Sequence, residues 1–295
     1  MAHTPTAGPS EPSAFANEEV DLAIASLAIH ATLFPLACYI AWKHGKFGMV
    51  SWPIFATFFV IRFVSTGWKI SHRDDPKLLN SASSFTAGGL LSCLTLTLIG
   101  IVYEIGIIIP EAAASPKKNK TLLGLTHLVM AVGVGITSYG GAPRPDAPDG
   151  IASTTVNKMG HFLMLLVITV LAAWIVFTGR RIAACRNHVQ FRNAKILLLT
   201  ASAGLPFQGV RLISASVYAL ARTPGLDPDT GTFTTKLVLV FLVELAVAII
   251  LCAGGWLSRA VKNPGTTSEP RDGSVDGKET AVWRVTELGV AQSHD

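Results

Sequence analysis

Three ionisable residues lie in the middle of long apolar segments. Arg62 is in FFVIRFVSTG, Arg211 is in PFQGVRLIS and Glu244 is in LVFLVELAVAII. A charged side chain at the centre of a bilayer costs at least about 2.5–3.5 kcal/mol on insertion scales, so such residues are paired or line a functional site. The sequence predicts that Glu244 pairs with Arg211, because their segments are consecutive, and that Arg62 is a second partner or holds a polar or anionic ligand group. The alternative is a buried ion pair that only fixes the register of the helices.

The apolar segments that carry these residues have the length of membrane spans. The chain of 295 residues is 50% hydrophobic and 15% charged, with a mean hydropathy of +0.46, whereas soluble proteins carry about 25% charged residues. A bilayer core of roughly 30 Å takes about 20 apolar residues per helix. Seven windows satisfy this, and they predict an all-α, polytopic bundle of seven transmembrane helices: 22–42, 51–70, 84–109, 121–139, 158–178, 196–221 and 233–257.

The charges of the loops predict the orientation. The basic stretches KHGK (43–46), KKNK (117–120) and RRIAACRNHVQFRNAK (180–195) are alternate loops, and the loops between them carry mixed charge. Short loops rich in Lys and Arg stay in the cytosol, so we expect the N-terminus outside or in the lumen and the C-terminus in the cytosol. The same loops explain the net charge of +5 without nucleic acid as a partner. We expect anionic lipid or a cytosolic partner at Arg180, Arg181, Arg186 and Arg192.

The two ends of the chain differ in composition from the spans. Residues 1–20 are polar and lack the basic stretch and apolar core of a cleavable signal peptide. We expect a disordered N-terminus over 1–20, a transmembrane domain over 21–260 and a disordered cytosolic tail over 261–295.

With this orientation the three central charges fall at one depth. Arg62, Arg211 and Glu244 each lie roughly 13–17 Å from the outer end of their spans, at 1.5 Å per residue. A second polar level lies nearer the cytosol, where Glu104 and His127 are each roughly 8–9 Å deep. Glu104 is the better candidate for a general acid, because arginine partners would keep Glu244 ionised. The alternative is that the Glu104 side chain extends towards the membrane interface, so that its carboxylate is hydrated there.

Metal and redox chemistry have little support in the sequence. The four cysteines, Cys38, Cys93, Cys185 and Cys252, are scattered and have no CxxC spacing. His30 and His161 are single histidines without an HxxxH or HxxE partner, so neither a metal site nor a cofactor is predicted.

Several segments together resemble a known family. They are HG at 44–45 followed by Arg62, SFTAGGLLSCLTL (84–96), THLVMAVGVGITSYGG (126–141), NKMGHFLMLLV (157–167), LPFQGVR (205–211) and GTFTTKLVLVFLVELAVAIIL (231–251). Over about residues 20–260 the chain resembles fungal seven-span integral membrane proteins that share a domain of unknown function. The resemblance implies that Arg211 and Glu244 are hallmark residues, and it suggests a link to secondary-metabolite genes. The chain departs from the family pattern at 214–218, and Glu104 is its own addition.

Three functions are compatible with these features. The first is a membrane protein that binds or moves a small amphipathic molecule, or senses it as a receptor, with Arg62, Arg211 and Glu244 lining the site. The second is an integral membrane enzyme of terpenoid-type secondary metabolism, in which Glu104 or Glu244 protonates the substrate. The third is a structural or assembly subunit. The sequence leaves the endoplasmic reticulum and the plasma membrane equally open.

Overall fold

The computed structural model describes residues 14–72, 76–113, 115–142, 144, 146, 151–221, 223–226 and 232–258. These residues belong to a compact unit, Met1–Val261, and the second unit, Lys262–Asp295, lies outside the described part. The predicted cytosolic tail, 261–295, therefore falls wholly outside it, as do residues 1–13 of the predicted N-terminal segment.

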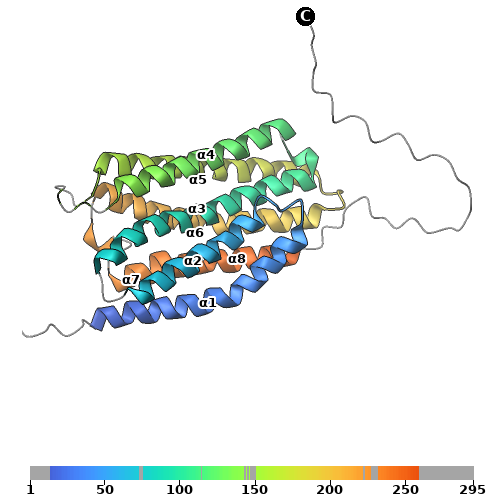
Figure 1. Cartoon of the computed structure of the whole chain (residues 1–295). Coiled ribbons are helices and arrows are strands. Elements are labelled where there is room, and N and C mark those ends of the chain that lie inside the picture. The colour runs from blue at the N-terminus through green and yellow to red at the C-terminus, as the bar shows by residue number, and fades with distance from the viewer. Residues whose placement is uncertain are drawn as a thin grey trace, which may run out of the picture. The chain divides into compact units, whose positions relative to one another are not determined.

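The unit is a bundle of long helices (Figure 1). Six spans are single helices, and the seventh is a short α-helix, a π-helical segment and a longer α-helix in succession. Short 3-10 segments, η1 (Pro110–Ala112) and η2 (Pro224–Leu226), lie in two of the connections. The spans are α1 (Ala14–His44), α2 (Trp52–Ser71), α3 (Pro76–Ile108), α4 (Pro116–Gly140), α5 (Thr154–Ala184), α6 (Phe191–Ala221) and the seventh, built from α7 (Phe233–Thr235), η3 (Lys236–Leu242) and α8 (Val243–Ser258).

The predicted fold class is confirmed. Seven of the described helical segments are long and apolar enough to cross a membrane, from Val20–His44 to Phe233–Ser258. The first helix begins at Ala14, inside the segment predicted to be disordered. Its membrane-capable part begins only at Val20, so the helix extends beyond the apolar stretch that the sequence pattern detects.

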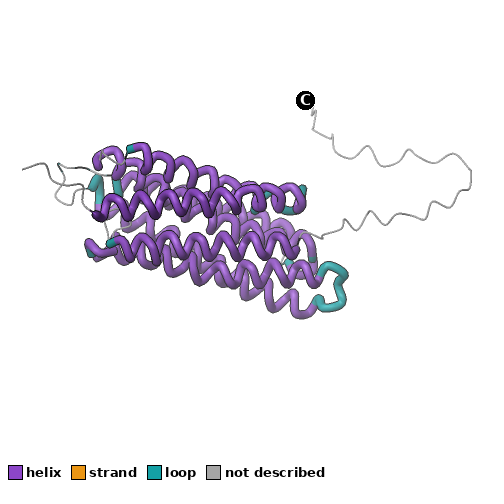
Figure 2. The backbone as a smooth tube through the Cα atoms, turned by 90° about the horizontal axis from the view of Figure 1, so that it is seen from below, coloured by secondary structure: helices purple, strands orange, loops and turns teal. Residues whose placement is uncertain are grey.

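Helix α3 lies at the centre of the bundle. It packs against α2, α4 and α6, and more lightly against α5, while α1 packs against α2 and α8. The chain folds up and down, so the ends of α1, α3, α5 and α8 meet the starts of α2, α4 and α6 on one side (Figures 1 and 2).

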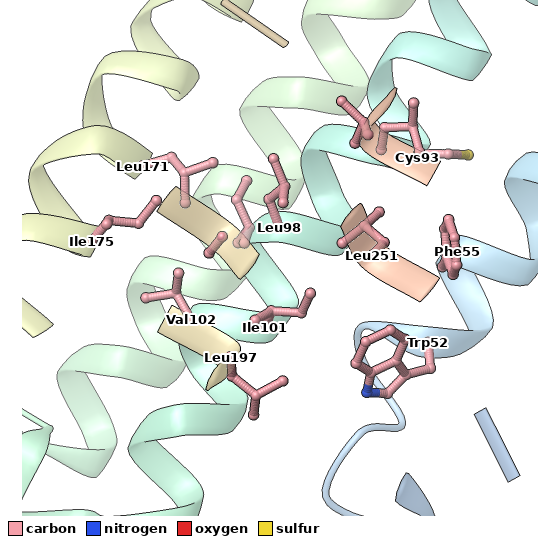
Figure 3. Close-up of a cluster of buried hydrophobic side chains, with 14 of the residues drawn as sticks. Trp52, Phe55, Cys93, Leu98, Ile101, Val102, Leu171, Ile175, Leu197 and Leu251 are labelled. Carbon is pink, nitrogen blue, oxygen red and sulfur yellow. The ribbon is translucent and has the colours of Figure 1, made fainter. Parts of the chain in front are cut away.

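The core is filled by large apolar side chains from α2, α3, α5, α6 and α8 (Figure 3). Large apolar side chains are also exposed on the outside, including Leu128 on α4, Phe162 on α5 and Ile213 on α6. A soluble protein rarely exposes so much contiguous apolar surface, whereas a bilayer solvates it. Helices α1 and α6 continue through an internal proline, Pro35 and Pro206 respectively, which bundles tolerate because neighbouring groups compensate for the missing backbone donor.

Candidate functional site

Glu244 is shared by two arginines at the core of the bundle. Nη1 of Arg62 lies 3.0 Å from Oε2 of Glu244, and Nη1 of Arg211 contacts Oε1 of the same carboxylate. The side chains of Glu244, Arg211 and Arg62 are 0%, 6% and 12% exposed. Both carboxylate oxygens thus face a guanidinium, and the structure brings together all three residues that the sequence placed at one depth.

Each member comes from a different helix. Arg62 lies on α2 and Arg211 on α6, while Glu244 is the second residue of α8, directly after the π-helical segment η3. Helix α6 packs against α8, which explains the close Arg211–Glu244 contact. Segments of π-helix are rare and occur frequently at functional sites, where the extra residue in the turn redirects a side chain.

Two residues of α1, Ser26 and His30, lie beside the cluster, and aromatic rings from α2 and η3 pack against His30. Oγ of Ser26 accepts a hydrogen bond from Nε of Arg62 at 3.2 Å, and the backbone carbonyl of Ser26 accepts one from Nδ1 of His30 at 2.7 Å. His30 is fully buried and lies within electrostatic reach of Arg62 and Glu244. Its ring packs against three phenylalanines with centroids 5.8–6.2 Å away: Phe58, Phe59 and Phe241.

The cluster has more positive charge and more donors than its acid can satisfy. Two guanidiniums and one carboxylate give a charge of +1, and a guanidinium carries five N–H donors. Among the buried groups that lack a hydrogen-bond partner within the described residues are Nε2 of His30 and the whole side-chain amide of Gln208. Gln208 lies one turn before Arg211 on α6 and is 0% exposed. Unsatisfied buried polar groups of this kind are costly, so this level of the bundle suits a ligand with acceptor atoms.

Glu104 belongs to a second buried cluster, near the end of α3. Its Oε1 lies 2.6 Å from Nδ1 of His44, and its Oε2 accepts hydrogen bonds of 3.0 Å from both Oγ of Ser51 and Nε1 of Trp52. Nε2 of His44 lies 3.1 Å from the carbonyl oxygen of Gly255 on α8. His44 and Glu104 are 0% and 1% exposed. The cluster therefore joins the end of α1, the start of α2, α3 and the end of α8.

The family model of a domain of unknown function, DUF7702, matches residues 17–261. The chain belongs to the DUF7702 family. No curated protein and no solved structure matches the chain. The matched range of this DUF7702 chain contains both buried clusters.

The sequence predicted that Glu104 and His127 share a second polar level, and the structure gives them different partners. Nδ1 of His127 bonds to the carbonyl of Leu123 in its own helix, and Nε2 of His127 has no hydrogen-bond partner among the described residues. Glu104 instead takes His44 as its partner. Sequence reasoning missed His44 because the HG dipeptide was assigned to a loop. The signal was its depth: His44 ends the first span at the same end of the bundle as Glu104.

Other predicted features of the DUF7702 chain carry little chemistry. Cys38, Cys93, Cys185 and Cys252 are free cysteines. Within the part of the chain that the structure describes, His, Cys, Asp and Glu do not gather in groups of three or more. His161 bonds through Nδ1 to the carbonyl of Asn157 one turn before it. The two buried clusters are therefore the candidates for function.

Proposed function

We propose that this chain is an integral membrane protein that binds or moves a small amphipathic molecule, whose acidic head group lies at Arg62 and Arg211. The observation that carries the proposal is the sharing of one carboxylate, Glu244, by two buried guanidiniums. An uncompensated cation inside a membrane is costly. A ligand anion would neutralise it and accept hydrogen bonds from the donors that remain.

The surroundings support an amphipathic rather than a wholly polar ligand. The phenylalanine rings beside His30 give the cluster an apolar wall, which fits a hydrocarbon or ring system attached to the acidic group. The unpartnered Gln208 amide offers both a donor and an acceptor to that head group.

The source of the protein, its pathway and its membrane are also proposals. The resemblance to fungal seven-span proteins supports a fungal source and a role beside secondary-metabolite biosynthesis, in the endoplasmic reticulum or the plasma membrane. Membership of a family of unknown function is compatible with this role and supplies no reaction.

Acid catalysis has weaker support than binding. Protonation of a substrate needs a carboxyl group that can face it with a proton to give. Glu244 faces two guanidiniums, and Glu104 receives contacts on both oxygens from His44, Ser51 and Trp52. These contacts favour a role for Glu244 as the fixed countercharge of the two arginines. They favour a role for Glu104 in joining neighbouring helices.

Binding to three amphipaths of equal chain length tests the proposal. The purified full chain in phosphatidylcholine nanodiscs is titrated with decyl sulfate, decanol and decyltrimethylammonium, which share a decyl chain and have an anionic, a neutral and a cationic head group. We expect saturable binding of decyl sulfate with a rise in melting temperature, because a ligand that binds only the folded state stabilises it. Equal binding of all three would contradict the proposal.

Arg62→Gln is the decisive variant, because Glu244 keeps Arg211 as its partner while the surplus charge disappears. We expect at least about a tenfold loss of decyl sulfate affinity, which corresponds to 1.4 kcal/mol. Lys195→Gln is the matched control, since it removes one exposed cation from α6. Unchanged affinity in Arg62→Gln would show that the cluster is only an internal ion pair.

Deletion of the gene in the native host separates a carrier from an enzyme. Loss of a discrete product with accumulation of its precursor would point to an enzyme. Unchanged chemistry with altered export, uptake or sensitivity to a compound is the result we expect.

A further inference from the structure

The contacts of His44 fix where its protons lie. The carbonyl of Gly255 can only accept a hydrogen bond, and the hydroxyl of Ser258, 3.5 Å from Nε2, already donates to the carbonyl of Gly254 at 2.7 Å. Nε2 of His44 therefore carries a hydrogen. Nδ1 then faces Oε1 of Glu104 at 2.6 Å, a distance at which two lone pairs would repel. One more proton must lie between them.

This proton forms part of a contact between two helices. With the proton present, His44 and Glu104 form a charge-assisted hydrogen bond between α1 and α3. When the proton leaves, the neutral imidazole has one N–H for two acceptors, so either the contact with Glu104 or the contact with the Gly255 carbonyl loses its hydrogen bond. The proton balance is simple: the imidazolium–carboxylate pair becomes imidazole, carboxylate and one released proton.

The surroundings of the pair are otherwise neutral. From α2 it meets the hydroxyl of Ser51 and the indole of Trp52, whose ring centroid lies 4.6 Å from that of His44. From α8 it meets the Gly255 carbonyl and the Ser258 hydroxyl. On α1 the neighbouring cation, Lys43, is exposed and lies over the Trp42 and Tyr39 rings. Among the described residues, no other charged side chain contacts the pair, so its own proton decides its charge.

The residues that follow His44 are exposed. His44 is the last residue of α1, and the next residues, Gly45 and Lys46, are exposed. Gly45 has a φ of 53°, a left-handed conformation that glycine adopts without strain. The exposed surface next to the pair along α1 is therefore at the end of the bundle that carries the basic loops.

The same helices hold the ligand cluster. Helix α8 carries both Glu244 and Gly255, which are eleven residues or roughly 16 Å apart along the axis. Helix α1 carries both Ser26 and His44, and α2 carries both Arg62 and Trp52. A ligand that shifts these helices at Glu244 also shifts the groups that hold the proton, and such coupling is reciprocal.

We propose that His44 and Glu104 form a proton-binding site coupled to the Arg62–Arg211–Glu244 cluster, so that the protein exchanges a proton when it binds its amphipathic anion. The coupling rests on the proposed function, whereas the proton site rests on the His44–Glu104 geometry alone. A carrier with this arrangement would use a proton gradient to move its ligand.

Calorimetry with decyl sulfate tests the coupling. Titrations of the full chain in nanodiscs are run at several pH values, and at each pH in two buffers of different ionisation enthalpy, which gives the number of protons exchanged per bound ligand. We expect a value between zero and one that varies with pH in the wild type. It should vanish in His44→Gln and Glu104→Gln, and it should persist in His72→Gln, the control with a partly exposed histidine at the end of α2.

The outcomes separate the two proposals. Binding of decyl sulfate without proton exchange at any pH would overturn the coupling and leave the binding function standing. Absence of binding would overturn the binding function. The proton site is then tested by nitrogen NMR of histidine-labelled wild-type protein, with His44→Gln for assignment. We expect a doubly protonated His44 ring, and a ring that carries a single proton whenever the protein is folded would overturn the site.

Discussion

At the scale of single residues, the buried cluster contains two cations and one anion. Glu244 is the one acid that both Arg62 and Arg211 contact. Loss of either arginine leaves the carboxylate with a partner, whereas loss of the carboxylate leaves two buried guanidiniums facing each other. The three substitutions therefore have different costs.

Glu244→Gln should be the most destabilising of the three, by roughly 3–5 kcal/mol, because it leaves buried charges uncompensated. Arg62→Gln and Arg211→Gln should each cost less. Thermal unfolding of the purified variants in nanodiscs measures this order. Added decyl sulfate should partly restore Glu244→Gln, since an anion replaces the lost countercharge. Equal losses in all three variants would contradict the shared carboxylate.

The sequence predicted this cluster because charge is rare in a membrane and depth can be counted along a helix. Arg62, Arg211 and Glu244 are conspicuous among apolar neighbours. His44 was missed because it lies at the end of a span, where a polar residue attracts no notice. Which of two polar residues at one depth meets Glu104 depends on how the helices are rotated about their axes, and hydrophobicity alone does not specify that rotation.

At the scale of elements, close helix contacts explain how the clusters are held. Glycines allow helix backbones to approach in membranes, and those near the end of α8 do this most clearly. A Cβ at Gly255 would lie 2.6 Å from both Ile40 Cγ2 and the Trp52 ring, and a Cβ at Gly254 would overlap the Thr200 side chain. The end of α8 is thereby held against α1, α2 and α6, with the carbonyl of Gly255 facing His44.

Gly254→Ala should destabilise the protein by about 1–3 kcal/mol, because the added methyl group overpacks the contact with Thr200. Gly209→Ala is the matched control. A Cβ at Gly209 in α6 would meet no atom within 4 Å, so alanine there should be neutral or stabilising by up to about 1 kcal/mol, through helix propensity. Melting temperatures of the two variants in detergent decide between these expectations. A stable Gly254→Ala protein would mean that α6 and α8 can separate without loss.

Element boundaries were partly predictable. The seven apolar windows located every span, because backbone groups in lipid must bond within a helix. The π-helical segment Lys236–Leu242 was not predicted, since its residues have the same apolar pattern as an α-helix. Its effect appears only in three dimensions, where it immediately precedes Glu244 and presents Phe241 to His30.

At the scale of the whole transmembrane unit, charge is distributed unevenly between the two ends. The end that contains the His44–Glu104 pair carries ten exposed cations among the described residues: Lys43, Lys46, Lys117, Lys118, Lys120, Arg180, Arg181, Arg186, Arg192 and Lys195. Glu111 is the exposed acid described at this end. We propose that this surface faces the cytosol and anionic lipid headgroups, which attract such clusters by about 1 kcal/mol per Lys or Arg.

Cysteine labelling in sealed microsomes, whose cytosolic face is outward, tests this orientation. In a background without Cys38, Cys93, Cys185 and Cys252, single cysteines are placed at Lys118 on the basic end and at Asp146 on the opposite end, both exposed positions. We expect an impermeant maleimide to label Lys118→Cys directly and Asp146→Cys only after detergent is added. Full labelling of both in detergent is the control.

The opposite labelling pattern would invert the orientation and change the mechanism with it. The proton of the His44–Glu104 pair reaches water through the end that holds Gly45 and Lys46. If that end faces the cytosol, as we expect, the proton exchanged on ligand binding passes between the pair and the cytosol. If it faces the lumen, the proton passes between the pair and the lumen. The labelling result therefore fixes the side of the membrane with which the His44–Glu104 pair exchanges its proton.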